Sequence, residues 1–321
     1  GKKGKNKWAI DAKNVKECFK GFDTLVMDEV HKAKSVSSLT YKMLRAVAAN
    51  TEYALGLTGT PFGKDLSDLW TQFYLIDFGE TLGPTLGFYR SAFFKTKVNF
   101  WGGYEYIFKK ELFPTLQRLI SIDEFADMPP RQYVVKGMKP HDGIANYAKA
   151  ALAEIKKVIA KKDSSNYRAV ESQYLQLRQL SSGFMSLHGE DNNKVQVKFD
   201  ENPKLDVLQE LIESMPHDSK MIVFHHFVYT NQLISERLTE MKVQHARIWG
   251  GQKDPIGQLG LFKNKDDCRV LVLNSKSGSS SLNLQHANYL VFFEQPDSAI
   301  DRQQAERRAW RPGQTKRVMI I

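Results

Sequence analysis

Short apolar runs alternate with segments of helical periodicity in the first third of the chain. Residues Thr24–Met27 form a continuous apolar run that ends abruptly in two acids, which is typical of a strand buried on both faces. A polar segment of helical character covers residues 38–49, and Tyr53–Leu57 then form a second run. Strands that alternate with helices predict crossover connections and a parallel sheet.

The middle of the chain has helical periodicity alone. Apolar residues recur three and four positions apart over residues 144–159, which predicts a long amphipathic helix. A second helix is predicted over Tyr167–Leu180, with Gly183 as the left-handed residue that commonly follows a helix. Pro129 and Pro130 mark the break before this helical region.

The last third returns to the strand and helix pattern. Asn202 and Pro203 have the form of a helix cap followed by a first-turn proline, so a helix is expected to begin there. Five later apolar runs predict strands at Met221–Phe224, Ala246–Trp249, Arg269–Leu273, Tyr289–Phe293 and Val318–Ile321.

The predicted fold class is therefore α/β, with two parallel-sheet lobes joined by a helical connector. The boundaries expected from the pattern are residues 1–130 for the first lobe, 131–200 for the connector and 201–321 for the second lobe.

Composition narrows the classes of protein. The 321 residues are 42% hydrophobic and 26% charged, ordinary values for a globular chain, and no apolar stretch reaches the length of a membrane span. The amino end is basic but lacks the apolar core of a signal peptide. Cys18 and Cys268 stand at no metal-ligand spacing, so we expect free thiols in a reducing compartment.

The net charge points weakly to a polyanionic partner. Lys and Arg number 46 against 36 Asp and Glu, which leaves a formal charge of +10. A basic chain of this kind is compatible with nucleic-acid binding and equally with plain solubility. The motifs have to decide between these alternatives.

Two acids follow the first predicted strand. Asp28 and Glu29 stand where the carboxyl end of a parallel strand meets a loop, which is where ligands bind in open α/β sheets. Phosphoryl transfer to water needs a carboxylate to hold Mg²⁺ and a second group to orient the water. The alternative is an ordinary acidic loop.

Small hydroxyl residues follow the second predicted strand. Thr58 and Thr60 flank Gly59 ahead of Pro61, and adjacent parallel strands would bring this loop to the same rim as the acids. Their hydroxyls can hydrogen-bond to acids or backbone there. A plain turn built on Gly and Pro is the alternative.

Two arginines stand near the carboxyl end. Arg308 and Arg311 are three residues apart, so on a helix they would share a face and could clamp an anion. An exposed basic helix face is the alternative, although it does not account for the Arg-Pro-Gly-Gln sequence of residues 311–314.

Taken together, these segments resemble the motifs of one enzyme superfamily. Asp28–His31 looks like motif II of DExH-type superfamily-two helicases, and Leu57–Pro61 looks like motif III. Met221–Phe227 resembles motif IV, and Asn274–Leu284 resembles motif V. The segments occur in the expected order.

The last motif identifies a branch. Gln304–Gln314 has the Q-A-x-x-R-x-x-R-x-G-Q form of motif VI, and Leu177–Leu180 reads Leu-Arg-Gln-Leu. Both are similar to the Swi/Snf-like branch, particularly its compact phage and bacterial members. The resemblance covers nearly the whole chain and implies that the two lobes are RecA-like.

The resemblance also implies roles for residues of the first lobe. Asp28 would hold Mg²⁺ through water, and Glu29 would be the catalytic base. His31, Thr58 and Thr60 would couple the state of the nucleotide to the geometry of the two lobes.

In the second lobe, Arg308 and Arg311 would be arginine fingers facing Asp28 and Glu29 across a cleft, with Gln304 assisting. The residues implied to lie along the nucleotide and nucleic acid are Ser277, Gly278 and Asn283.

The implied function is a DNA helicase or translocase that uses ATP and Mg²⁺ and acts on duplex DNA rather than single strands or RNA. The phosphate-cradling sequence G-x-x-x-x-G-K-[ST] does not occur in the chain. We therefore expect the chain to start inside the first lobe, to leave that lobe incomplete, and to hydrolyse ATP poorly by itself.

Two alternatives stay open. One is a non-enzymatic DNA-binding or scaffold module derived from a helicase, and the other is the motor part of a restriction or repair complex. The expected location is the cytoplasm of a bacterial or phage-infected cell, or the nucleus in a eukaryote.

Overall fold

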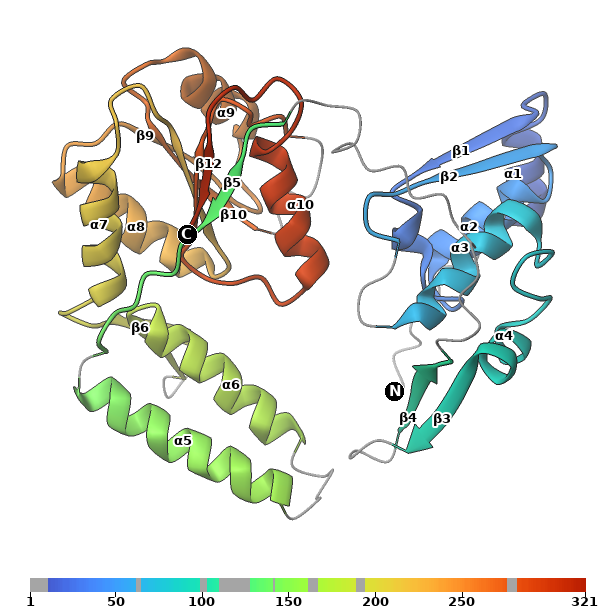
Figure 1. Ribbon diagram of the computed structural model, residues 1–321, viewed down its shortest axis with the longest axis horizontal. Helices are drawn as coiled ribbons and strands as arrows, with labels where there is room; N and C mark the ends of the chain where they lie inside the picture. Colours follow the sequence, from blue (N-terminus) through green and yellow to red (C-terminus); the bar gives the residue numbers. More distant parts are fainter. Residues whose placement is uncertain are drawn as a thin grey trace, which may run out of the picture. The chain divides into compact units, whose positions relative to one another are not determined.

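The computed structural model describes residues 11–61, 65–98, 103–109, 128–140, 142–160, 167–188, 194–275 and 282–321. The chain forms two compact units, Gly1–Arg118 and Leu119–Ile321 (Figure 1). The predicted finer division at residues 130 and 200 stays a prediction. None of the helices within these ranges is long and apolar enough to cross a lipid bilayer.

The first unit is built around a parallel pair of strands. β1 (Thr24–Asp28) pairs with β2 (Tyr53–Leu57), with Asp28 opposite Leu57 at the carboxyl ends. An antiparallel hairpin of β3 (Phe94–Val98) and β4 (Tyr104–Phe108) follows later in the unit. The described helices are α1 (Ala12–Cys18), α2 (Leu39–Ala48), α3 (Leu69–Asp77) and α4 (Leu86–Phe93), with the short 3₁₀ helices η1 (Val30–Ala33) and η2 (Leu66–Asp68).

The prediction that the apolar run of β1 is buried on both faces is wrong. Met27 is buried among residues of η1, α2 and α3, whereas Val26 on the opposite face is 55% exposed. Leu55 and Leu57 of β2 are exposed to a similar degree. Alternate side chains point to opposite faces, and α2, α3 and α4 pack on the face that carries Met27.

The second unit is a parallel α/β sheet, which confirms the predicted fold class. Its strands run in the order β5-β12-β11-β8-β10-β9, and every neighbouring pair is parallel. The strands are β5 (Arg131–Tyr133), β8 (Met221–His225), β9 (His245–Ile248), β10 (Val270–Asn274), β11 (Tyr289–Phe292) and β12 (Val318–Ile320). The covering helices are α7 (Pro203–Ser214), α8 (Val228–Glu240), α9 (Pro255–Asn264) and α10 (Ala299–Ala309).

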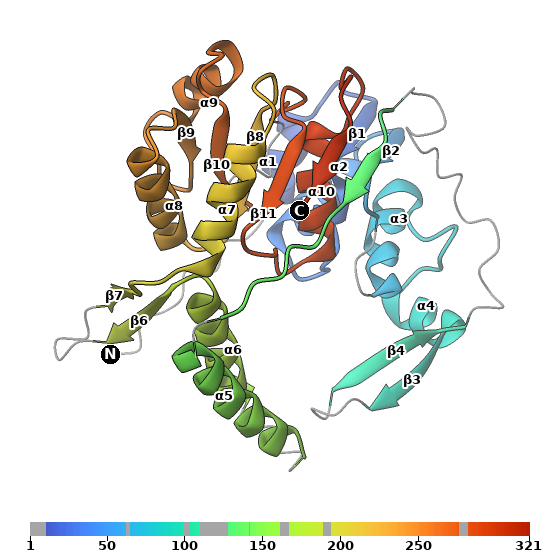
Figure 2. The same ribbon diagram turned by 60° about the vertical axis from the view of Figure 1, so that its left-hand side comes forward.

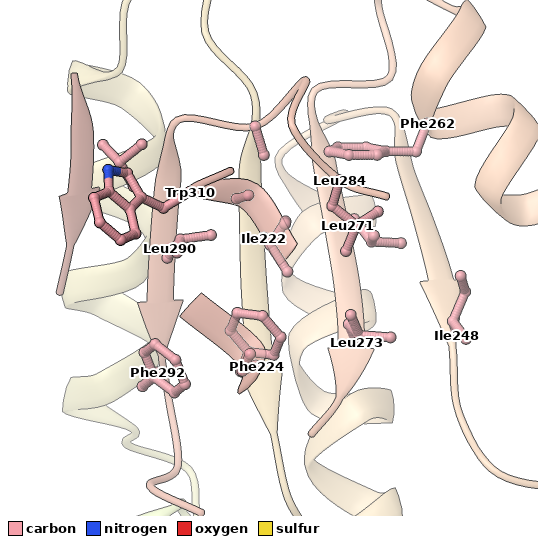
Figure 3. Packing of buried hydrophobic residues seen from close by; sticks show 14 of the residues in the cluster. Ile222, Phe224, Ile248, Phe262, Leu271, Leu273, Leu284, Leu290, Phe292 and Trp310 are labelled. Carbon is pink, nitrogen blue, oxygen red and sulfur yellow. The ribbon is translucent and has the colours of Figure 1, made fainter. Parts of the chain in front are cut away.

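Successive side chains along each strand point to opposite faces of this sheet. Ile222 and Phe224 of β8 pack with residues of α9 and α10, and the rings of Phe224 and Phe292 stack at 4.7 Å (Figure 3). Met221 and Val223 pack on the other face with α7 and α8. With helices on both faces, β8 and β10 are buried along their whole length and β11 along nearly all of it, as expected for a buried parallel sheet.

One strand of this sheet lies outside the predicted set. β5 pairs with β12, with Arg131 opposite Val318 and Tyr133 opposite Ile320. Its sequence, Arg-Gln-Tyr, has neither an apolar run nor clear alternation, and all three residues are exposed. Only the pairing with β12 makes this segment a strand.

A helical arm precedes the main part of the sheet. α5 (Asp142–Ala160) and α6 (Tyr167–Ser181) run side by side, and the Tyr147 hydroxyl donates to Gln176 Oε1 at 2.8 Å (Figure 2). The antiparallel hairpin of β6 (Phe184–His188) and β7 (Lys194–Lys198) follows. Both helices agree with the sequence prediction to within two residues.

The turn between the arm and α7 is fixed by two residues. Gly183, two residues after the end of α6, has φ +88°, the left-handed conformation expected there. Asn202 is the N-cap of α7, accepting from the Leu205 amide through Oδ1 and donating to the Ser182 carbonyl through Nδ2. A Cβ atom at Gly183 would lie 2.0 Å from Asn202 Nδ2.

Replacing Gly183 by alanine is therefore expected to lower the free energy of unfolding by about 2 to 4 kcal/mol, because left-handed strain and overpacking against the buried Asn202 add. Urea unfolding followed by circular dichroism measures the change. Gly251→Ala is the matched control, since Gly251 has φ +84° but no heavy atom lies within 4 Å of the Cβ that the substitution would add. Equal losses in the two variants would contradict the role given to Asn202.

Candidate functional site

The loop after β1 begins with two adjacent acids in a constrained backbone. Asp28 is the exposed last residue of β1, and Glu29 follows with φ 55° and ψ 46°. A residue with a Cβ atom seldom adopts this left-handed conformation, and such outliers concentrate at functional sites. The conformation turns the chain directly from β1 into η1.

Close polar contacts, one an ion-pair distance and two of them hydrogen bonds, link this loop to the loop after β2. Glu29 Oε2 lies 3.1 Å from His31 Nδ1, and the same nitrogen lies 2.8 Å from Thr58 Oγ1. Thr58 Oγ1 also accepts from the Thr60 amide at 3.1 Å. Four of the predicted site residues therefore lie together in the first unit, as the parallel pairing of β1 and β2 requires.

Thr60 has a polar atom without a partner. The residue is 6% exposed, and its Oγ1 is shielded from solvent and lacks a hydrogen-bond partner among the described residues. The loop beyond is held by Gln72, whose Nε2 donates to the carbonyls of Pro61 and Asp68. Buried hydroxyls are nearly always paired, so this one is suited to a further ligand or a water.

In the second unit, α10 carries the predicted arginine. Arg308 is 8% exposed, and its Nη1 is buried without a hydrogen-bond partner among the described residues. Burial lowers the pKa of Arg308 to about 10, and the charge of Asp301 partly opposes this shift. The guanidinium therefore stays protonated at neutral pH, and a buried cation of this kind is suited to an anion.

Gln304 lies one turn earlier on α10 and is half-buried. Arg311 departs from the prediction. α10 ends at Ala309, and Trp310 is extended with φ −88° and ψ 90°, so Arg308 and Arg311 do not share a helix face.

Tertiary contacts hold Trp310 at the end of α10, shortly before Pro312, which disfavours further helix. Its indole Nε1 donates to the Pro129 carbonyl at 2.8 Å, and the Arg131 guanidinium lies 3.6 Å from the ring centroid. Beyond it, Gly313 has φ +93°, and the Gln314 side-chain amide donates to the carbonyls of residues 285 and 287. The sequence Arg-Pro-Gly-Gln thus forms a turn that docks on the loop before β11.

The remaining predicted residues are placed only in part. Ser277 and Gly278 lie outside the described residues. Asn283 is exposed, and its Oδ1 accepts from the Gln285 amide at 3.4 Å. The prediction that the acids of the first unit face the arginines of the second stays a prediction, because the two groups belong to different units.

Sequence reasoning missed Glu294, which follows β11 at the carboxyl edge of the sheet. This residue is 4% exposed, and its carboxylate accepts from the amides of His226 and Phe227 and from the Thr230 hydroxyl. The carboxylate thereby holds the bend between β8 and α8. The signal in the sequence was an acid directly after an apolar run, as at Asp28.

His225 is locked beside this bend by a second chain of hydrogen bonds. Its Nδ1–H donates to the Phe227 carbonyl at 3.0 Å, and Nε2 accepts from Asn231 Nδ2 at 2.9 Å. Asn231 Oδ1 in turn accepts from Arg247 Nε at 2.7 Å. Burial lowers the pKa of His225 to about 4, opposed in part by the charge of Glu294.

Comparison with known proteins finds a family match within the second unit. Residues 203–313 match the family described as "Helicase conserved C-terminal domain". The matched range begins at the first residue of α7 and ends at Gly313, in the turn after α10.

The chain is also similar to longer proteins over most of its length. It is 23% identical over 311 residues to the CHD3-type chromatin-remodeling factor PICKLE of Arabidopsis thaliana, covering 93% of the chain and 22% of that protein. It is 25% identical over 309 residues to an uncharacterized ATP-dependent helicase of Mycoplasma genitalium, covering 94% and 28%. The chain thus spans less than a third of the length of these relatives.

Among solved structures, the SWI2/SNF2 ATPase core of Sulfolobus solfataricus in complex with dsDNA is 20% identical, with a TM-score of 0.44. The alignment covers 92% of the chain and 62% of that structure.

The buried neutral His225 predicts a pH dependence of stability. Its folded pKa of about 4 lies below the ordinary value of 6.5, so between these values the unfolded state binds a proton that the folded state excludes. Stability therefore falls as pH drops through this window, by about 2 to 3 kcal/mol from this residue. Urea unfolding at several pH values should give a flatter profile for His225→Gln than for the wild type, and parallel profiles would contradict the assignment.

Proposed function

We propose that the chain is part of an ATP-dependent motor that acts on duplex DNA. One observation carries this proposal. The match to the helicase C-terminal domain runs through α10, and this helix holds a buried guanidinium whose Nη1 has no partner among the described residues. A cation prepared in this way fits the phosphate charge that ATP hydrolysis generates.

The acids of the first unit suit the hydrolytic half of such a site. Asp28 presents an exposed carboxylate at the carboxyl end of a strand, and Mg²⁺ is usually bound by one or two carboxylates together with water and phosphate oxygens. When bound, the ion would neutralise charge on the phosphates. Asp28 would hold the ion through water, as the resemblance of residues 28–31 to motif II implies.

Glu29 is the proposed base that takes the proton of the attacking water. Its carboxylate is oriented by His31 at 3.1 Å, and His31 is in turn held by Thr58 at 2.8 Å. A change at the loop of Thr58 and Thr60 would therefore reach Glu29 through a single imidazole. We propose that the first unit senses the nucleotide through these contacts of His31.

Arg308, with Gln304 one turn away and Arg311 in the following turn, is proposed to stabilise the phosphate charge. Arg311 would approach from the turn rather than from the helix face, because α10 ends before it. Ser277, Gly278 and Asn283 are proposed to line the nucleotide or the nucleic acid.

Duplex DNA is the proposed track. The relatives are by name a chromatin-remodeling factor and an ATP-dependent helicase, and the chain carries a net charge of +10. Because its sequence lacks G-x-x-x-x-G-K-[ST], we propose that these 321 residues alone bind ATP weakly and turn it over slowly. The proposed location is the cytoplasm, or the nucleus in a eukaryotic cell.

In a version of the protein that carries a phosphate-binding loop, Glu29→Gln and Arg308→Ala are each expected to lower DNA-stimulated ATP hydrolysis by roughly 10³-fold or more. Glu29→Gln removes the base, and Arg308→Ala removes stabilisation of transition-state charge. A steady-state phosphate-release assay measures the loss. Arg307→Ala is the matched control, since Arg307 is the exposed neighbour on the same helix. Near wild-type hydrolysis in either site variant would remove the role assigned to that residue.

Binding of a fluorescent 30-base-pair DNA by the 321-residue chain tests the proposed track. Because contacts to several phosphates release counterions, affinity is expected to fall about a hundredfold between 50 and 200 mM salt. Fluorescence anisotropy measures the binding, with unlabelled single-stranded DNA and RNA duplex as competitors. Salt-independent binding, or equal competition by all three nucleic acids, would speak against a duplex-DNA groove.

A further inference from the structure

Three elements of the second unit converge on one short segment. This segment, residues 294–298, connects β11 to α10, and we call it the β11–α10 segment. Arg178 lies in the last turn of α6, within the Leu-Arg-Gln-Leu sequence of residues 177–180. No role has been assigned to it above. Its contacts attach the helical arm to this segment.

Arg178 makes two polar contacts with the segment. Its Nη1 donates to Asp297 Oδ1 in an ion pair, and its Nη2 donates to the Gln295 carbonyl at 2.7 Å. The side chain is 15% exposed, and the guanidinium lies 5.5 Å from the Phe227 ring and 5.8 Å from the Tyr174 ring. A planar guanidinium that bonds a carboxylate and a main-chain oxygen together fixes direction as well as distance.

The segment in turn contacts the bend between β8 and α8. Glu294 accepts from the His226 and Phe227 amides, and His226 Nε2 lies 3.7 Å from Asp297 Oδ2. Asp297 is therefore shared between the arm and the bend.

The same segment starts α10. Ser298 is the N-cap of α10, and its hydroxyl accepts from the Ile300 amide at 3.2 Å. Gln295 Oε1 accepts from Arg302 Nη1 at 2.6 Å, and Arg302 also pairs with Glu306 at 2.7 Å. The first two turns of α10 are thus anchored on the segment that Arg178 holds.

We infer that Arg178 is a positioning residue, which fixes the β11–α10 segment and through it the helix that carries Gln304 and Arg308. The inference rests on the proposed function for its consequence in catalysis. In this arrangement the orientation of the arm sets the start of α10, so a partner that displaces the arm changes where the Arg308 guanidinium lies.

Hydrogen–deuterium exchange of the 321-residue chain, read by mass spectrometry, tests the arrangement without nucleotide or DNA. Arg178→Met keeps the length of the stem and removes both polar contacts. Amides of residues 226–231 and 295–305 are expected to exchange at least about tenfold faster than in the wild type, while β9 and α9 stay unchanged. Exchange rates in Arg178→Lys should lie between those of the wild type and of Arg178→Met, because one ammonium cannot reproduce the guanidinium's bonds to two oxygens.

Arg237→Met is the matched control. Arg237 on α8 is 24% exposed and bonds Asp206 and Gln209 at 2.9 and 3.1 Å, so it resembles Arg178 in burial and in its contacts. Its loss should change exchange near those partners and leave residues 295–305 as they are.

The double variant Arg178→Asp with Asp297→Arg exchanges the two charges. It distinguishes the effect of the ion pair from the effect of side-chain size. It is expected to recover at least half of the lost protection at residues 295–305, and no recovery would overturn the inference. Unchanged exchange there in Arg178→Met, or a uniform rise over the whole second unit, would also overturn it. If Arg178→Met does not fold, Arg178→Lys and the exchanged pair decide.

ATP hydrolysis, measured in the version of the protein that carries a phosphate-binding loop, distinguishes this inference from the proposed function. Arg178→Met is expected to lower kcat at least about fivefold and to leave KM for ATP near the wild-type value, because it misplaces a group that acts on the transition state. If Arg308→Ala lowers hydrolysis and Arg178→Met does not, the inference fails and the proposed function stands. If Arg308→Ala has no effect, the proposed function fails.

Discussion

The parallel alignment of strands is the constraint on which the rest of this structure depends. In both units it brings the residues that follow consecutive strands to one edge. Asp28 stands opposite Leu57, so the loops that hold Glu29 and Thr58 are neighbours, and His31 bridges them at 2.8 Å. In the second unit Asn274 stands opposite His225, and β11 pairs with the other side of β8. Helices cover both faces of that sheet, so the carboxyl edge is where polar side chains can gather.

The second unit contains buried charged side chains of two kinds. Glu294 is fully satisfied, because two amides and a hydroxyl donate to its carboxylate, and it serves to hold the bend after β8. Arg308 is buried with an Nη1 that has no partner among the described residues, and burial lowers its pKa to about 10. The first arrangement stabilises the fold, whereas the second leaves a buried cation whose desolvation the charge of Asp301 offsets only in part. This contrast is the physical basis for the structural role of Glu294 and for the binding role proposed for Arg308.

The polar network of the second unit also extends beyond the sheet. Arg178 attaches α6 to the segment that starts α10, and Tyr133 of β5 donates to Glu306 near the other end of α10. The helix with the proposed catalytic arginine is therefore held at both ends by residues that precede the matched helicase domain in the sequence. The residues that hold α10 in place therefore extend beyond the sequence range that matches the family.

The sequence alone determined the elements with strong local signals. The apolar runs of β8, β10 and β11, the Asn202 cap and the left-handed Gly183 follow from side-chain polarity and backbone preference, and all agree with the structure to within a residue. The motif order and the clustering of Glu29, His31, Thr58 and Thr60 were predictable because adjacent parallel strands share an edge. Tertiary structure decided what depends on distant partners. β5 is a strand only because β12 pairs with it, and Val26 is exposed because α2, α3 and α4 pack on the opposite face. The end of α10 accords with Pro312, which disfavours helical backbone at the preceding residue. The position of the chain beyond α10 was decided by the bond of Trp310 to Pro129, because that partner lies 181 residues away in the sequence.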